Sequence, residues 1–136
     1  MNILKILVFL LFTSFYKPSE GCSNIYLIRH AEKVRTDKSD RDPDLNKNGF
    51  LRAINWKNYF SDKNISRIYS TNYKRTIKTV KPLAENNSLE IILYSSDDII
   101  YEAFLKSSIG KNTLVVGHSN TIPGFVNNLI DEDYYD

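Results

Sequence analysis

Short apolar segments that favour strands alternate with segments of helical pattern along most of this 136-residue chain. The strand-like segments are residues 25–28, 67–69, 89–94 and 113–116, and the helical ones are residues 46–60, 73–85, 97–107 and 122–130. Strands that are separated by helices usually run parallel in one sheet, with the helices packed on its faces. The alternation therefore predicts a single α/β domain built in layers around a largely parallel sheet.

Two of the helical segments carry finer predictions. In the first, Phe50, Leu51 and Ile54 join an aromatic group at residues 56–60 in one apolar face, which we expect to be buried. In the second, Pro82 lies inside the helical pattern and is expected to kink the helix or end it early, since proline lacks the N–H group that a helix interior needs.

The N-terminal residues differ from the rest of the chain. Lys5 is followed by an unbroken apolar run at residues 6–12, which is too short to cross a membrane but typical of a signal peptide. Residues 1–21 are therefore interpreted as an export signal, and residues 22–136 as the folded domain. A buried N-terminal helix and an uncleaved anchor are the alternatives. Cys22, the only cysteine, is either a site of lipid attachment or a residue without a special role.

The charge balance of the chain limits the kinds of partner that we expect it to bind. The chain has 18 Lys and Arg against 16 Asp and Glu, a net charge of +2, and no block of like charge. This balance is typical of a solvated, mildly basic surface and does not favour binding to nucleic acid.

The only two histidines occupy matching positions. His30 and His118 each come one residue after a short apolar strand. Ligands of open α/β sheets collect beyond the carboxyl ends of the strands. If the two strands are parallel neighbours, both imidazoles face the same crevice, so we interpret the pair as functional rather than structural.

Two arginines indicate the charge of the ligand. Arg29 directly precedes His30, and Arg75 follows another short strand near the start of a helix. A guanidinium binds phosphate through two parallel hydrogen bonds, and helix N–H groups favour an anion at the same place. Taken alone, Arg75 would by default be interpreted as an exposed helix residue. Together, the four side chains predict a site for a dianion such as a phosphate ester.

At this point the sequence resembles a known family. Three segments are similar to the motifs of the histidine phosphatase family, the relatives of phosphoglycerate mutase, and to its compact bacterial members. They are Arg29-His30-Ala31-Glu32-Lys33, Ser70-Thr71-Asn72-Tyr73-Lys74-Arg75-Thr76 and Val116-Gly117-His118-Ser119-Asn120. The segment at residues 44–53 also resembles the entry into that family's first helix.

The resemblance implies a fold and a set of roles. It implies a three-layer α/β sandwich of the phosphoglycerate mutase type, with a largely parallel central sheet. It implies that His30 is phosphorylated during catalysis and that Arg29, Arg75 and His118 bind the transferred phosphoryl group. It implies no cofactor, and no metal ion is needed because the arginines supply the positive charge.

The family pattern leaves the proton donor and the end of the chain open. Ser119 stands where the acid phosphatase branch has an aspartate, so membership of that branch is not expected. The other branch takes its acid from a stretch that corresponds to residues 94–102. Asp97 or Asp98 could serve there, yet Ser96 and Asp97 are also candidate N-caps of the next helix. The chain is either a minimal version of the domain or incomplete at its C-terminus.

The sequence thus supports two hypotheses. The first is an exported phosphoric monoester hydrolase that acts on a small phosphorylated substrate through phosphohistidine, in the periplasm or outside the cell, with membrane attachment only if Cys22 is lipidated. The second is a non-catalytic phosphate-binding or interaction module on the same fold. The retention of both histidines and both arginines favours the enzyme.

Overall fold

The strands of the protein form one four-stranded sheet in which every neighbouring pair is parallel. The computed structural model describes residues 21–136. The strands are β1 (Asn24–Arg29), β2 (Ile65–Thr71), β3 (Ile91–Tyr94) and β4 (Asn112–Gly117). Their order across the sheet is β1-β4-β2-β3. The predicted parallel α/β sheet is confirmed.

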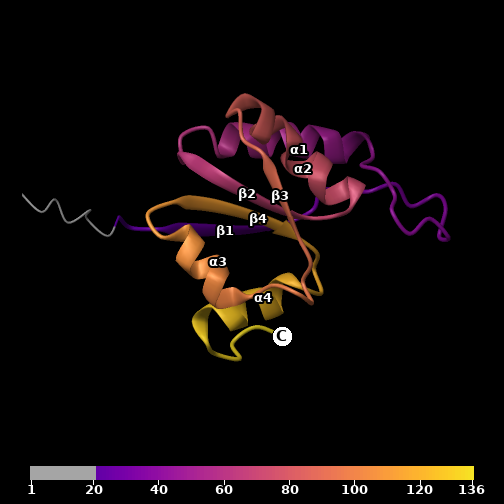
Figure 1. Cartoon of the computed structure of the whole chain (residues 1–136). Coiled ribbons are helices and arrows are strands. Elements are labelled where there is room, and N and C mark those ends of the chain that lie inside the picture. Colours follow the sequence, from indigo (N-terminus) through magenta and orange to yellow (C-terminus); the bar gives the residue numbers. More distant parts are fainter. Residues whose placement is uncertain (1–20) are drawn as a thin grey trace, which may run out of the picture.

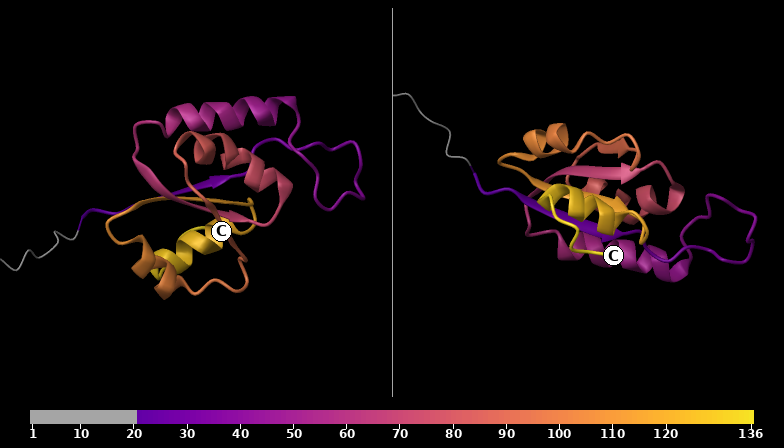
Figure 2. Two further views of the ribbon diagram at one scale, coloured as in Figure 1. Left: turned by 45° about the horizontal axis from the view of Figure 1, so that its top comes forward. Right: turned by 90° about the horizontal axis from the view of Figure 1, so that it is seen from below.

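Helices cover both faces of the sheet. They are α1 (Lys47–Tyr59), α2 (Lys74–Asn86), α3 (Tyr101–Ser108) and α4 (Ile122–Ile130). Helices α1 and α2 lie on one face, and α3 and α4 lie on the other (Figures 1 and 2). The predicted three-layer sandwich is confirmed.

The central strand β4 carries the most buried part of the core. Leu114, Val115 and Val116 are fully buried, and they alternate between the two faces. Leu114 and Val116 pack with residues of α1, α2 and β2, whereas Val115 packs with Phe104 of α3 and Phe125 of α4. A strand buried on both faces reads as a continuous apolar run, which is why residues 113–116 were recognisable in the sequence.

All four strands end at the same edge of the sheet, because they are parallel. The segment between β1 and α1 extends from that end of the molecule (Figure 2). This segment is joined to itself at its base by an antiparallel bridge between Lys33 and Leu45. The loop edge of the sheet is therefore the place where side chains from β1, β4 and the start of α2 meet.

Two predictions of where helices begin or end were wrong. Helix α2 continues through Pro82 to Asn86, because burial of Val80, Leu83 and Ala84 offsets the hydrogen bond that proline cannot make. Helix α3 begins at Tyr101 rather than near residue 97, and its N-cap residue makes no side-chain cap bond. Ser96 and Asp97 therefore do not cap this helix.

The predicted apolar face of α1 was only partly right: Phe60, directly after the helix, is fully buried and Trp56 packs against the core, but the other large apolar residues are more exposed. Phe50, Leu51 and Ile54 are 47%, 57% and 44% exposed. The buried positions of α1 are Gly49 and Ala53, whose small size brings the helix backbone against the segment that follows β1. Periodicity identified a helix here but not which face packs.

The part of the sequence interpreted as an export signal, residues 1–21, lies outside the described residues except for its last position. Cys22 is exposed and has a free thiol. No helix within residues 21–136 combines the length and the hydrophobicity needed to cross a membrane.

Gly49 supports a prediction about stability. A Cβ atom at this position would lie 2.1 Å from the carbonyl oxygen of Glu32, so the backbone would have to move. We expect Gly49→Ala to lower the free energy of unfolding by about 1–3 kcal/mol, measured by urea denaturation. The control is Gly124→Ala in α4, where a Cβ meets no atom within 4 Å and the better helix propensity of alanine should stabilise by up to ~1 kcal/mol. Equal effects of the two substitutions would contradict this packing argument.

Candidate active site

The two histidines lie together because β1 and β4 are adjacent. Arg29 at the end of β1 is in register with Gly117 at the end of β4, and the His30 N–H group donates to the Gly117 carbonyl oxygen at 3.0 Å. One residue beyond each strand, the two imidazole rings stand 5.4 Å apart between centroids in an edge-to-face arrangement. The predicted convergence of the only two histidines is therefore present in the structure.

A backbone hydrogen bond defines the tautomer of His30. Its Nδ1 atom lies 2.7 Å from the carbonyl oxygen of Ala31. Because a carbonyl oxygen can only accept, Nδ1 carries the proton, and Nε2 of the neutral ring keeps its lone pair. Burial lowers the pKa of His30, the bond to Ala31 opposes this shift, and the positive charges of Arg75, Arg29 and Lys33 lower it further. His30 is therefore a neutral imidazole with an available nitrogen nucleophile.

Thr79 connects this nucleophile to α2. Its Oγ1 atom accepts from the Ala31 N–H group at 2.8 Å and donates to the carbonyl oxygen of Arg75 at 2.6 Å. Thr79 is completely buried. One hydroxyl thus ties the residue that orients His30 to the turn of α2 that carries Arg75. The sequence analysis missed Thr79; its place one helical turn after Arg75 is the signal that could have identified it.

Buried hydroxyls orient His118. Its Nε2 atom lies 2.9 Å from Oγ1 of Thr71. This hydroxyl donates to Oγ1 of Thr76 at 3.1 Å, and the Thr76 hydroxyl can donate to the carbonyl oxygen of Thr71. Since each hydroxyl has one proton, this chain of donors leaves Thr71 to accept from His118, so Nε2 carries the proton. Burial, followed by the charges of Arg75 and His30, lowers the pKa of His118 to about 4. Without a ligand, His118 is therefore neutral above pH 5.

Arg75 is the most enclosed cation of the site. Its side chain is 11% exposed, and its guanidinium lies over the ring of Tyr73 at 4.3 Å from the centroid. Tyr73 also contacts His118, with 5.0 Å between ring centroids. The Nε atom of Arg75 is buried without a hydrogen-bond partner among residues 21–136. A buried N–H group that lacks an acceptor is unfavourable, and an anion could supply that acceptor.

The segment between β1 and α1 also reaches Arg75. Asp42 accepts from the backbone N–H of Lys74 at 2.9 Å, in the first turn of α2, and lies 3.7 Å from the guanidinium of Arg75. The Arg41 carbonyl oxygen accepts from Arg75 at 3.5 Å. Nothing in the local sequence pattern of this segment identified Asp42 as a partner of α2.

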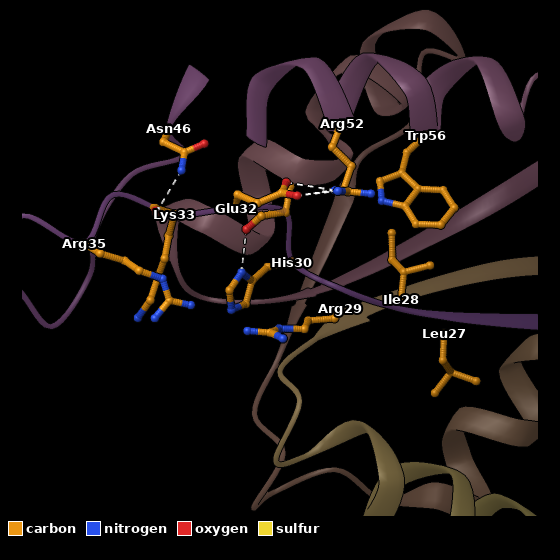
Figure 3. Close-up of a pocket in the computed structure, with 11 residues that line it drawn as sticks. Leu27, Ile28, Arg29, His30, Glu32, Lys33, Arg35, Asn46, Arg52 and Trp56 are labelled. Carbon is orange, nitrogen blue, oxygen red and sulfur yellow. Dashed lines mark hydrogen bonds and ion pairs between the residues drawn. The ribbon is translucent and has the colours of Figure 1, made fainter. Parts of the chain in front are cut away.

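Two open hollows flank the histidine pair. One, of about 580 Å³, is lined by Arg29, His30 and neighbouring residues of the β1–α1 segment, with Arg52 and Trp56 of α1 at its other side (Figure 3). The other, of about 510 Å³, is lined by residues at and just beyond the ends of β2, β3 and β4, among them His118, and by Arg75 in the first turn of α2. Arg29 is exposed at the end of β1, and its charge lowers the pKa of both imidazoles. The four residues predicted from the sequence are therefore brought to one place.

The two candidate acids differ in position. Asp97 lines the hollow that contains Arg75 and His118, whereas Asp98 is not part of its lining. Tyr94 lines the same hollow, and burial raises the pKa of its hydroxyl to about 12, so it remains protonated at neutral pH. Within residues 21–136, no group of three His, Cys, Asp or Glu side chains is placed to hold a metal ion.

The fold and the site together define an α/β protein with a histidine pair and two arginines at the carboxyl ends of its parallel strands. The family model of the histidine phosphatase superfamily, branch 1, matches residues 25–96, which is more than half of the sequence and includes His30 and Arg75. The chain belongs to this superfamily, and its membership supports a phosphatase activity.

Solved structures share the fold at low sequence identity. The protein assigned as phosphohistidine phosphatase SixA of Agrobacterium tumefaciens is 23% identical, with a TM-score of 0.62 over 80% of this chain and 77% of that one. Phosphoserine phosphatase of Entamoeba histolytica is 19% identical, with a TM-score of 0.58 over 80% of both chains. Mycobacterial glucosyl-3-phosphoglycerate phosphatase is 13% identical, with a TM-score of 0.66 over 80% of both. No curated protein sequence gives a significant match.

The environment of His118 supports a titration experiment. We expect His118 to titrate near pH 4 in the free protein and at a higher pH when inorganic phosphate is bound, because an adjacent dianion favours the charged imidazolium. Imidazole chemical shifts followed by NMR measure both values, and His118→Gln identifies the resonance among the two histidines. A pKa near the ordinary 6.5 in the free protein, or one that phosphate binding does not raise, would contradict the proposed burial and contact.

Proposed function

We propose that the protein hydrolyses phosphomonoesters through a phosphohistidine intermediate on His30. The observation that carries this proposal is the tautomer of His30, whose Nδ1–H group is held by the Ala31 carbonyl oxygen while Nε2 is left with its lone pair. A site that only bound phosphate would be served by a protonated ring, whereas this ring is arranged as a nucleophile.

In the first step, Nε2 of His30 attacks phosphorus, the P–N bond forms, and the P–O bond to the leaving group breaks. The bond from Nδ1–H to the Ala31 oxygen stabilises the positive charge that the ring acquires. In the second step, water attacks phosphorus and the P–N bond breaks, which releases inorganic phosphate and restores the neutral ring.

The surrounding cations stabilise the transferred group. Arg75 and Arg29 supply guanidinium donors to its oxygens, and phosphoryl transfer depends mainly on such positioning and charge neutralisation. His118 contributes as the second imidazole, since a bound dianion raises its pKa and lets it take up a proton. The catalytic and phosphate-binding roles of Arg29, His30, Arg75 and His118 belong to this proposal.

Asp97 is the proposed proton donor to the leaving group. It lines the hollow with His118 and Arg75, and it does not cap α3, so the structural role that competed with this function is removed. After the leaving group departs, the same carboxylate can accept a proton from the attacking water.

Export is part of the proposal and rests on the sequence of residues 1–16, with Lys5 before an apolar run. The substrate would then be a small phosphorylated compound outside the cytoplasm. Lipid attachment at Cys22 is compatible with its exposure. Fractionation of cells that make the full chain tests this location.

The nucleophile is tested by trapping the intermediate. Rapid acid-free quenching of the protein with para-nitrophenyl phosphate should give a chain heavier by one phosphoryl group, with the group mapped to His30 by mass spectrometry. His30→Ala should lose both this adduct and turnover while retaining its circular dichroism spectrum. Turnover that survives in His30→Ala, or a phosphoryl group on His118, would contradict the assignment. Binding of phosphate without any turnover of phosphoesters would favour the non-catalytic module.

The proton donor is tested with two leaving groups. Para-nitrophenolate departs without a proton, whereas an alkyl alcohol needs one. We expect Asp97→Asn to lower kcat/KM for glycerol 3-phosphate by roughly 10²–10⁴-fold and that for para-nitrophenyl phosphate far less, as measured by phosphate release. Asp98→Asn is the matched control and should leave both values nearly unchanged. A larger loss in Asp98→Asn, or equal losses on both substrates in Asp97→Asn, would rule out Asp97 as the acid.

A further inference from the structure

Two further cations lie beside His30 and have no part in the chemistry described above. Lys33 and Arg35, on the segment that follows β1, line the same hollow as His30 and Arg29. In Figure 3 their charged ends lie on the opposite side of His30 from Arg52 and Trp56. Both residues also line a smaller hollow at the base of the protruding segment, so the pair stands at the boundary between the two spaces.

Backbone hydrogen bonds hold Lys33 at this position. The N–H group of Asn46 donates to the Glu32 carbonyl oxygen at 2.9 Å, and that of Val34 donates to the Asp44 carbonyl oxygen at 2.8 Å. The side chain of Asn46, which also caps α1, donates to the Lys33 carbonyl oxygen at 3.3 Å. Lys33 is thus anchored on both sides and does not move freely with the exposed part of the segment.

Neither cation has a counterion within residues 21–136. Other cations nearby do: Arg52 pairs with Glu32, and Lys78 pairs with Asp44. The side chains of Lys33 and Arg35 make no ion pair or hydrogen bond in that part of the chain. Unpaired cations grouped beside Arg29 repel one another, and a bound anion would relieve this repulsion.

The carboxylates of the same segment are engaged elsewhere. Asp37 accepts from the backbone N–H and the hydroxyl of Ser39, and Asp40 accepts from the backbone N–H of Asp42. These bonds close local turns. Asp37 and Asp40 line the smaller hollow with Lys33 and Arg35, but neither carboxylate lines the hollow that contains His30.

The positive charge reaches the reacting centre. Lys33 is one of the charges that lower the pKa of His30 and of His118. The hollow on the other side of the histidine pair has one arginine, Arg75, which the proposed function assigns to the transferred phosphoryl group, and one carboxylate, Asp97. A negatively charged arm of a substrate would be repelled there and attracted toward Lys33.

We propose that Lys33 and Arg35 form a second anion subsite, and that the preferred substrates are small compounds with two phosphoryl groups. One phosphoryl group would occupy the centre at His30, so this inference rests on the proposed function. Two positive charges match a second phosphate dianion, whereas a carboxylate would be matched by one. Lys33 and Arg35 then act as specificity-determining residues and leave the chemical step to the others.

Matched substrates and matched variants test the subsite. Wild-type protein should prefer fructose 1,6-bisphosphate to fructose 6-phosphate in kcat/KM, and Lys33→Gln/Arg35→Gln should lower the value for the bisphosphate by roughly 10- to 100-fold, since hydrogen bonds to charged groups contribute on that scale. The value for para-nitrophenyl phosphate should change by less than about threefold. Lys81→Gln/Lys106→Gln removes the same charge from exposed positions on α2 and α3, outside the hollows, and should change neither value.

Three kinetic outcomes would overturn the subsite. Equal losses on the bisphosphate and on para-nitrophenyl phosphate would mean that the cations serve the common phosphoryl group. Unchanged values for both would mean that they bind nothing. A preference for 3-phosphoglycerate over the bisphosphate that depends on Lys33 and Arg35 would replace the second phosphate by a carboxylate.

A binding measurement separates this inference from the proposed function. Calorimetric titration of fructose 1,6-bisphosphate into His30→Ala needs no turnover, and adding Lys33→Gln/Arg35→Gln should weaken binding by the same 10- to 100-fold. Tight, cation-dependent binding with no turnover in the wild type would disprove the phosphatase proposal and leave the subsite standing. Turnover of monophosphates by a protein whose bisphosphate binding does not depend on Lys33 and Arg35 would disprove the subsite and leave the phosphatase proposal standing.

Discussion

The site depends on the parallel pairing of β1 with β4. These strands are far apart in the sequence, yet their register sets Arg29 opposite Gly117 and extends by one more bond from the His30 N–H group to the Gly117 oxygen. That bond brings the first residue after each strand to the same level of the sheet edge, so the two imidazoles meet at 5.4 Å. A slip of the register would separate the histidines and leave each as an ordinary loop residue.

Around this pair, the protein concentrates positive charge and keeps the rings neutral. Burial and the neighbouring cations both lower the imidazole pKa values, so positive charge comes from Arg29 and Arg75 while His30 keeps a lone pair. The buried hydroxyl of Thr79 ties the two parts of the arrangement together, since it bonds both the segment that orients His30 and the turn that carries Arg75. The segments that carry His30 and Arg75 are thereby connected through one buried side chain.

Much of the fold followed from local patterns, and the failures have specific causes. Strand β4 was recognisable because a parallel strand that is buried on both faces is nearly continuously apolar. The first half of α1 was predicted wrongly because the small residues Gly49 and Ala53, rather than Phe50, Leu51 and Ile54, form its packing surface. The predicted early end of α2 at Pro82 was wrong because burial of the inner face of the helix outweighs one missing hydrogen bond.

The sequence by itself determined the α/β class, the family, and the histidine and arginine residues that gather at the site, because these depend on residue type and on local order along the chain. The tertiary structure alone decided which nitrogen of His30 carries the proton, that Thr71 and Thr79 support the two imidazole-bearing segments, and that Asp97 rather than Asp98 lines the hollow that contains His118. Each of these features is a contact between segments that are brought together only by folding or by the exact path of a turn. Local sequence pattern does not specify such partners, because hydrogen-bond geometry depends on where the whole chain places both groups.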